Sequence, residues 1–419
     1  MPTTPVPSTR APALTERPGS ALPVATPSTT PPGLSGLDPA ELESWFVEHG
    51  QPRYRARQVA DALWRGTATS AEEVRTLPAD LREALGRHFS WDTLADTEVR
   101  VTDGGETEKA LHRLADGALV ESVLMRYPAR EGRRERNTLC ISSQAGCAVG
   151  CPFCATGELG FERDLSTAEI VDQVRHAARR LAHEGGHLTN IVFMGMGEPL
   201  LNLDRVLAAV DALNDRRRLG LGARHITVST SGVVPGIRRL TGLGPQFTLA
   251  VSLHAARDAL RDVLVPLNRR WPVAEVVAAA RDHASSTGRR ISYEYTMIGG
   301  INDTDEDALA LAELLRDEHA HVNLIPMNPV AHTPWQSSPA DVIERFAGRL
   351  RAARIPVTIR RNRGVEVGAA CGQLAAERAG EPPVASVARR RERLVRESAA
   401  ALRGERSTDE APANTGEGS

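Results

Sequence analysis

Three cysteines stand close together as Cys147-Ala-Val-Gly-Cys151-Pro-Phe-Cys154, a CxxxCxxC motif. Three thiolates can hold three irons of a 4Fe–4S cluster and leave the fourth iron open to another ligand. Clusters with four cysteines usually carry electrons only, whereas an open iron can bind a molecule and pass it one electron. The motif therefore predicts redox chemistry at a bound ligand.

Zinc and disulfides are the alternative uses of these cysteines. A structural zinc site needs a fourth Cys or His at ligand spacing, and the next candidates, Cys140 and His176, lack such spacing. A disulfide framework is typical of short secreted chains, whereas this chain has 5 cysteines in 419 residues and no export signal or membrane span. We therefore expect a soluble cytoplasmic protein with reduced thiols.

The formal net charge of −2 indicates no class of partner. Lys109 is the only lysine, so arginine supplies nearly all the positive charge, and it gathers in three places: residues 126–136, 216–218 and 351–363. Such clusters suit phosphate contacts, although most charged runs are solvated surface.

Both ends of the chain have compositions typical of disorder. Residues 1–36 are mostly Pro, Thr, Ser and Ala, and residues 377–419 are charged and rich in Pro, Ala and Gly. We predict that both segments are disordered. A short helix is possible over residues 386–402, but it shows no apolar face that needs a partner.

A small helical domain is predicted over residues 37–100. Asp38, Pro39 and Glu41 form a variant of the capping box at the start of its first helix, and further amphipathic helices begin near residues 55 and 79. Residues 101–132 should then supply linking strands and a basic loop.

Repeated β–α units follow, and they predict an α/β fold. The strand-like runs are residues 138–142, 190–194, 225–230, 247–253, 290–296, 322–326 and 356–360, and the helical runs are residues 167–183, 203–214, 234–243, 273–287, 306–316 and 340–353. Apolar strands alternating with helices indicate a parallel sheet. About six units fit a partial (βα)6 barrel over residues 133–366 better than a closed eightfold barrel.

Candidate ligand-binding residues stand where these strands end, as parallel α/β folds require. Gly195-Met-Gly197-Glu198-Pro199 could let the backbone approach a ligand and bind an ammonium group. The next ends carry Ser229, then Ser252-Leu253-His254, and later Asn328, whose amide could read an adenine edge. Each has an ordinary alternative: serines cap helices, and a lone histidine is usually structural.

Together these motifs resemble the radical S-adenosylmethionine (SAM) enzymes, and specifically the bacterial RNA adenine-C2 methyltransferases. The resemblance covers essentially residues 38–374. It is carried by residues 138–147, the cysteine triad, and residues 195–201, 229–235, 251–254, 325–329 and 369–374. It implies a radical SAM barrel with an RNA-binding accessory domain, one 4Fe–4S cluster and two molecules of SAM per turnover. Gly197 and Glu198 would hold the methionine amine, and the remaining cofactor contacts would come from Ser229, Ser252, Leu253, His254 and Asn328.

The resemblance also assigns the catalytic residues. Cys371, in a loop over residues 367–376, matches the cysteine that carries the methyl group, and Cys140 matches the thiol that resolves the RNA adduct through a transient disulfide with Cys371. Glu121 matches the proton acceptor. An additional arginine-rich stretch at residues 130–136 departs from the family pattern, so Glu131 and Glu135 compete for that role.

The implied substrate is adenine 2503 of 23S ribosomal RNA before full ribosome assembly, with adenine 37 of some transfer RNAs as a possible second substrate. A reducing electron donor such as a flavodoxin, a monomeric state and no membrane contact are also expected. The alternatives are a sister enzyme that methylates C8 of the same adenine and a zinc-stapled RNA-binding protein without catalysis.

Overall fold

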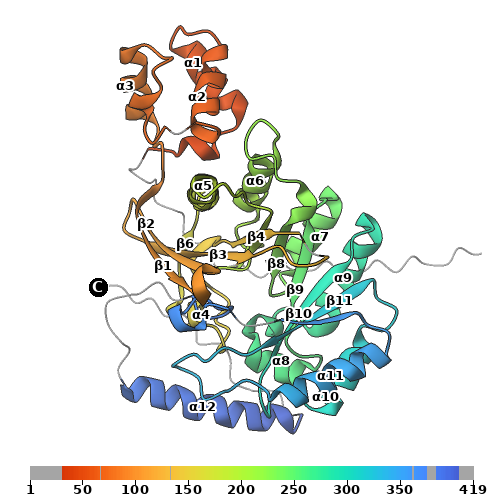
Figure 1. Cartoon of the computed structure of the whole chain (residues 1–419). Helices are drawn as coiled ribbons and strands as arrows, with labels where there is room; N and C mark the ends of the chain where they lie inside the picture. Colours follow the sequence, from red (N-terminus) through yellow and green to blue (C-terminus); the bar gives the residue numbers. More distant parts are fainter. Residues whose placement is uncertain (1–30, 67, 133, 361–362, 375–383, 405–419) are drawn as a thin grey trace, which may run out of the picture.

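The accessory helices form a module at one end of the molecule (Figure 1). The computed structural model describes residues 31–66, 68–132, 134–360, 363–374 and 384–404. The module contains α1 (Pro39–Glu48), α2 (Tyr54–Trp64) and α3 (Ala79–His88). The predicted capping box is confirmed, because the Asp38 side chain accepts a hydrogen bond from the Ala40 amide and the Glu41 side chain accepts one from the Asp38 amide.

The boundaries of the module differ from the predicted residues 37–100 at both ends. Leu34 is 4% exposed in its core, and the Leu34 amide donates to the Ser90 carbonyl over 2.9 Å. The prediction of disorder through residue 36 is therefore wrong for residues 31–36, whereas residues 1–30 lie outside the described part of the chain. At the other boundary, strand β1 (Leu94–Thr102) already begins within the predicted helical domain.

Seven strands form the predicted parallel sheet. They are β4 (Arg136–Cys140), β7 (Asn190–Phe193), β8 (Ile226–Thr230), β9 (Thr248–Ser252), β10 (Ile291–Met297), β11 (Ala320–Pro326) and β12 (Val357–Ile359). Each pairs in parallel with the next. The sheet is open, with β12 at one edge. The partial (βα)6 barrel is thus confirmed.

Six helices connect these strands and cover the sheet: α5 (Thr167–His183), α6 (Leu203–Asn214), α7 (Val234–Leu243), α9 (Val273–Thr287), α10 (Asp305–Leu314) and α11 (Ala340–Ala352). Helices on the outer face bury one side of every strand, which explains the continuous apolar runs of the sequence. Ser166 and Thr304 form capping boxes that fix where α5 and α10 begin.

An antiparallel extension continues the sheet beyond β4. Strand β1 pairs with β2 (Thr107–Leu114), β2 with β3 (Leu119–Tyr127), and β3 with β4. Between β4 and α5, the short strands β5 (Gln144–Gly146) and β6 (Phe161–Asp164) enclose the cysteine motif and helix α4 (Ala155–Leu159). These small elements were not predicted, because three or four residues carry too little periodicity.

The C-terminal helix corrects a second prediction. Helix α12 (Val384–Leu402) packs against α8 (Asp258–Leu264) along the lower edge of the molecule in Figure 1, whereas the sequence predicted a disordered tail. Leu394 and Ala401 are each 1% exposed, and Arg391 donates to the Thr333 carbonyl. The packed face was missed because it is narrow and consists mainly of small residues. Residues 375–383 and 405–419 lie outside the described chain.

None of the described helices is both long enough and apolar enough to cross a membrane.

The packing of α12 predicts that Leu394→Asp detaches this helix from α8. Burying a carboxylate in place of a side chain that is 1% exposed should cost at least about 2 kcal/mol of docking free energy. We expect faster limited proteolysis between residues 384 and 402. Val395→Asp is the matched control, because Val395 is 55% exposed on the same helix. Equal proteolysis of the two variants would contradict the described packing.

Candidate active site

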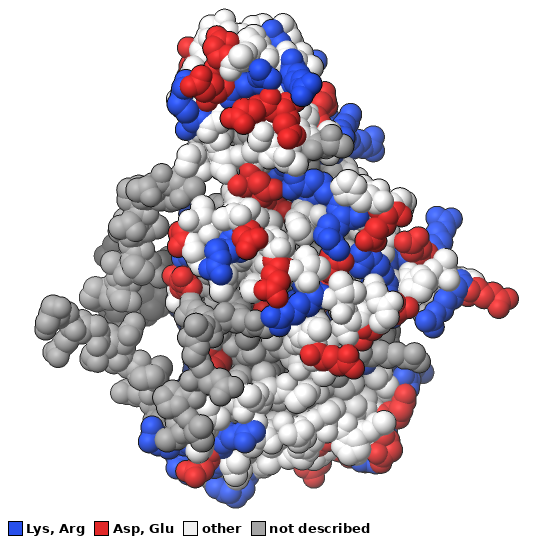
Figure 2. All heavy atoms as spheres, turned by 60° about the vertical axis from the view of Figure 1, so that its left-hand side comes forward, with Lys and Arg blue, Asp and Glu red and all other residues white. Residues whose placement is uncertain are grey.

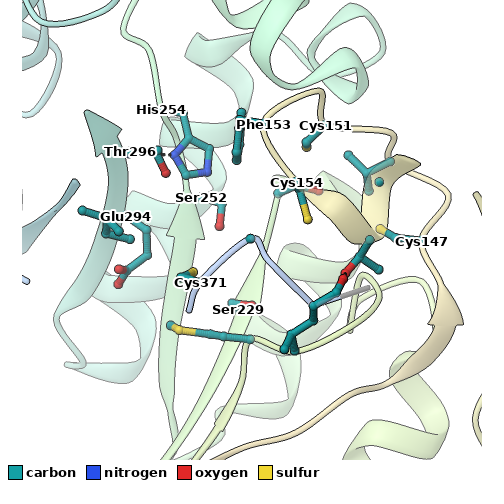
Figure 3. A pocket seen from close by; sticks show the side chains of 18 of the residues that line it. Cys147, Cys151, Phe153, Cys154, Ser229, Ser252, His254, Glu294, Thr296 and Cys371 are labelled. Carbon is teal, nitrogen blue, oxygen red and sulfur yellow. Dashed lines mark hydrogen bonds between the residues drawn. The ribbon is translucent and has the colours of Figure 1, made fainter. Parts of the chain in front are cut away.

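A single pocket gathers the residues that follow the parallel strands (Figure 3). It measures about 1040 Å³, counting the space that opens to solvent. Its lining includes most of the predicted site residues: Cys147, Cys151, Cys154, Gly197, Glu198, Ser229, Ser252, His254, Asn328 and Cys371. Three predicted residues are not part of the lining: Leu253, Glu121 and Cys140.

The cysteine loop is closed by a tight backbone contact. Gly146 has a φ of +72°, and a Cβ there would lie 1.9 Å from the Gly160 carbonyl oxygen, so only glycine fits. The Cys147 amide donates to that same carbonyl over 2.8 Å. Burial raises the pKa of Cys147 to about 12, so positive metal ions are needed to hold the motif in its thiolate form.

The donor set of the pocket fits a cluster better than a zinc ion. Three sulfurs face one pocket, whereas His176, a candidate fourth ligand for zinc, packs against His112 with ring centroids 5.3 Å apart.

The glycine-rich turn after β7 presents a buried carboxylate to the pocket. Glu198 is 3% exposed and accepts hydrogen bonds from the Ser231 amide, the Ser231 hydroxyl and the Leu200 amide at 2.6–3.0 Å. Burial raises the pKa of this carboxyl, and the hydrogen bonds from Ser231 oppose that rise. Gly197 has a φ of +102° and approaches Gln144 so closely that a Cβ would lie 2.6 Å from it. A fixed, buried carboxylate suits the ammonium group of an amino acid.

His254 lines the pocket and also holds the backbone of a neighbouring strand by a hydrogen bond. It has an unusual φ of +60° and is 5% exposed, and its Nδ1 accepts a hydrogen bond from the Thr296 amide (Figure 3). Burial lowers the pKa of His254 to about 3, so the ring is neutral and its proton is on Nε2. The ring packs edge-on against Phe153 of the cysteine loop, with centroids 4.8 Å apart.

The remaining predicted cofactor residues differ in what they offer. The Ser229 hydroxyl donates to the Phe193 carbonyl over 2.6 Å, which fixes it at the end of β8. The Asn328 amide nitrogen donates one hydrogen to the Cys371 carbonyl over 2.9 Å, which leaves its second hydrogen available to a ligand. Leu253 is fully buried, and its amide donates to the Glu294 carbonyl.

The Cys371 segment docks directly on the cysteine loop. The Gly372 carbonyl accepts from the Ala155 amide over 2.7 Å, and the Leu374 carbonyl accepts from the Thr156 hydroxyl over 2.6 Å. Cys371 itself is exposed to the pocket. The structure therefore places a fourth cysteine beside the three of the motif.

Cys140 ends β4, near enough to Cys371 for the two thiols to interact electrostatically. Burial, followed by the Cys371 thiol, raises the pKa of Cys140 to about 12, against the charge of Arg360. Desolvation by the surrounding pocket raises the pKa of Cys371 to about 11, and the charge of Arg360 opposes that rise too. All five cysteines are free thiols. The structure thus contains two neighbouring reduced thiols and no Cys140–Cys371 disulfide.

Glu121 is buried on β3 but faces a second, smaller cavity, in which it forms a 2.9 Å ion pair with Lys109. Its competitors lie at the surface. Glu131 is exposed, and Glu135 is exposed and accepts a hydrogen bond from Asn137. Of the three carboxylates, Glu121 is the one held inside the fold.

Sequence reasoning missed two buried charges. Arg261 is fully buried on α8 and donates to the carbonyls of Ser231, Ser252 and Leu253, which ties the ends of β8 and β9 together. Glu294 lines the pocket at 3% exposure. Glu294 could have been found from the sequence, because a glutamate within an apolar strand is unusual. Arg261 belongs to no motif and could not.

An open parallel sheet whose cysteine loop and glycine-rich turn share one pocket defines a radical SAM enzyme, and the model of the Radical SAM superfamily matches residues 141–315. The chain is 49% identical over 393 residues to a "Probable dual-specificity RNA methyltransferase RlmN" of Parafrankia sp., covering 90% of this chain and 100% of the relative. A protein of the same name from Salinispora tropica is 49% identical over 353 residues, covering 83% and 93%.

A solved structure supports the same assignment. The crystal structure of a radical SAM methyltransferase from Sphaerobacter thermophilus superimposes with a TM-score of 0.79 at 48% identity, covering 83% of this chain and all of the other. The chain belongs to the RlmN family of radical SAM RNA methyltransferases. Membership implies a 4Fe–4S cluster and SAM as cofactors.

The pocket predicts that Cys147→Ala, Cys151→Ala and Cys154→Ala each abolish cluster binding without unfolding the protein. Iron content should fall from about four per chain towards zero, because two thiolates cannot retain the cluster. Circular dichroism should remain unchanged. Cys140→Ala is the control and should keep its iron. A triad variant with full iron content would remove that cysteine from the ligand set.

Arg261→Met should weaken both stability and SAM binding. Breaking a buried, multiply hydrogen-bonded charge typically costs about 3–5 kcal/mol, and here it also releases the ends of β8 and β9. Denaturant unfolding and calorimetric SAM binding would measure the two effects. Arg239→Met, at an exposed ion pair with Asp204, should change neither. Normal SAM affinity in Arg261→Met would show that the strand ends hold their positions without it.

Proposed function

We propose that the protein methylates C2 of adenine 2503 in 23S ribosomal RNA, and C2 of adenine 37 in some transfer RNAs, with Cys371 as the methyl carrier. The observation that carries this proposal is the second set of thiols at the cluster pocket: Cys371 lines the pocket and Cys140 lies beside it. Radical chemistry on SAM alone needs only the triad, so two further thiols suggest covalent transfer through a cysteine.

The cofactors are assigned to the pocket residues. Cys147, Cys151 and Cys154 would hold the cluster, and SAM would bind Gly197, Glu198, Ser229, Ser252, His254 and Asn328. The predicted contact from Leu253 is left out, because this residue is fully buried outside the lining. Bound together, cluster and SAM supply the one-electron chemistry that a C2 carbon requires, because this carbon is not nucleophilic enough to take a methyl group directly. Two molecules of SAM would be used per turnover.

Cys371 is suited to carry the methyl group. Its sulfur would accept a methyl group from one molecule of SAM. A second molecule of SAM, cleaved after accepting one electron, would take a hydrogen atom from that methyl group, whose carbon would then bond to C2 of the adenine. The hydrogen bonds to Gly372, Leu374 and the Cys371 carbonyl hold the carrier in place during both steps. Desolvation raises the pKa of the Cys371 thiol, and the charge of Arg360 opposes that rise.

Release of the product requires a base and a second thiol. Glu121 would take the C2 proton, and the cluster that the triad would hold would accept the one electron that the adduct radical has to lose. Cys140 then attacks the Cys371 sulfur, a disulfide forms, and the electron pair of the broken carbon–sulfur bond stays with carbon, which takes a proton to become methyl. Cys140 pairs with Val123 in the β3–β4 register, two residues from Glu121, so the base and the thiol come from neighbouring strands.

The RNA and the electron donor are proposed partners of a monomeric enzyme. RNA would reach the site before full ribosome assembly, with helices α1–α3 as an additional contact. Acidic and basic side chains are interspersed on this module (Figure 2), so an RNA contact there would be local. Several predicted phosphate-binding arginines are structural instead: Arg218 donates to the Leu37 carbonyl, and Arg126 pairs with Glu108. A flavodoxin-like protein would supply electrons.

The roles of the two thiols predict opposite failures. Cys140→Ala keeps the carrier but lacks the resolving thiol, so it should accumulate protein joined to RNA through Cys371. Cys371→Ala lacks the carrier and should form no adduct. Denaturing electrophoresis of each variant purified from cells, with and without nuclease, would reveal a slow, nuclease-sensitive band for Cys140→Ala alone.

The double variant is the control for this experiment and should lack the band. The same band in both single variants, or in neither, would contradict the assigned roles. Nucleoside analysis of ribosomal and transfer RNA from cells with and without the gene identifies the substrates, and deuterium at C8 of adenine separates C2 from C8 methylation.

A further inference from the structure

The only lysine of the chain is buried. Lys109 lies on β2 at 6% exposure, although the chain contains 51 lysine and arginine residues in total. The strong bases elsewhere are all arginines. A lysine in this one place points to a requirement that arginine does not meet.

Lys109 contacts both a proposed catalytic residue and the segment of the methyl carrier. Its Nζ lies 2.9 Å from Oε1 of Glu121 and 3.5 Å from the Gly368 carbonyl oxygen, three residues before Cys371. A compact ammonium group with three donors can serve two acceptors that lie close together, whereas a guanidinium is larger and planar. The geometry explains why lysine is used here.

This ion pair belongs to a set of contacts that hold the segment before Cys371, residues 364–368. From the β1–β2 turn, Asp103 accepts a hydrogen bond from the Gly364 amide over 2.9 Å, and Thr102 donates to Glu366 over 3.2 Å. These contacts hold residues 364–368 at the end of the antiparallel extension. Lys109 contacts both this segment and Glu121.

The remaining charges at the small cavity come from β1. Glu98 and Arg100 line it together with Lys109, Leu111 and Glu121, and they form a 3.0 Å ion pair with each other at the half-exposed rim. Arg100 is the register partner of Lys109 in the β1–β2 ladder. Lys109 contacts the buried carboxylate of Glu121 directly, over 2.9 Å.

We propose that Lys109 is a positioning residue for the step that removes the C2 proton. Its ammonium group keeps Glu121 ionised in a buried site, where an isolated carboxyl would hold its proton and could not act as a base. Its contact with Gly368 ties that base to the segment that carries Cys371. The inference rests on the proposed function, because it takes Glu121 as the proton acceptor.

The test compares Lys109→Met with Lys109→Arg and Glu121→Gln in the full-length enzyme. Lys109→Met should still methylate Cys371, measured by mass spectrometry of the peptide, but should release methylated RNA at least about tenfold more slowly. It should therefore accumulate the nuclease-sensitive adduct, as Glu121→Gln does. Lys109→Arg, which keeps the charge, should restore part of the release rate. Arg239→Met on α7, at an exposed ion pair with Asp204, is the control and should release product normally.

Every other outcome contradicts a specific assignment, either the role of Lys109 or that of Glu121. Normal release by Lys109→Met, or loss of Cys371 methylation in that variant, would overturn the inference, the latter because it indicates a merely structural role. Adduct in Glu121→Gln but not in Lys109→Met overturns the role of Lys109 alone. No adduct in Glu121→Gln means that the proposed base itself is wrong. If Lys109→Met does not fold, Lys109→Gln, which keeps a donor for Gly368, decides between the same outcomes.

Discussion

The site depends on the return of one late segment of the chain to the open end of the sheet. Residues 363–374 follow the last strand, yet Cys371 must meet a loop formed more than 200 residues earlier. Hydrogen bonds to three separate parts of the fold secure this return: the Ala155 amide, the Asn328 side chain and the Asp103 carboxylate. The antiparallel extension thus acts as a support for the carrier, in addition to widening the sheet.

The rest of the pocket is rigid because its buried charges have fixed partners. Arg261 joins the ends of two strands through their carbonyls, and Glu198 is held by the Ser231 amide and hydroxyl. Burying such groups is costly unless their hydrogen bonds are satisfied, so each of them allows little alternative geometry. Preorganisation of this kind positions a cofactor without rearrangement at the moment of reaction.

The sequence predicted the regular part of the fold well, because strong periodicity and capping residues act locally. Helices α5, α6, α7 and α9 have the predicted bounds, and the pocket contains most of the predicted residues. The failures have a common cause in tertiary contacts. Leu34 and Leu394 become buried only because distant elements provide a surface, and the role of Arg261 depends on carbonyls from two other strands. Glu121 could be selected by motif, but its partner Lys109 could be recognised only in the structure.

The burial of Lys109 also determines how the protein reacts with reagents that modify amino groups. Acylating enzymes, amine-reactive cross-linkers and isopeptide-forming tags all require an accessible ε-amino group, and the only one in this chain is 6% exposed inside a β-sheet. In the folded state such reagents find no accessible ε-amino group. Conversely, acylation of the ε-amine would report that the sheet has opened, so a single side chain records whether the molecule is folded.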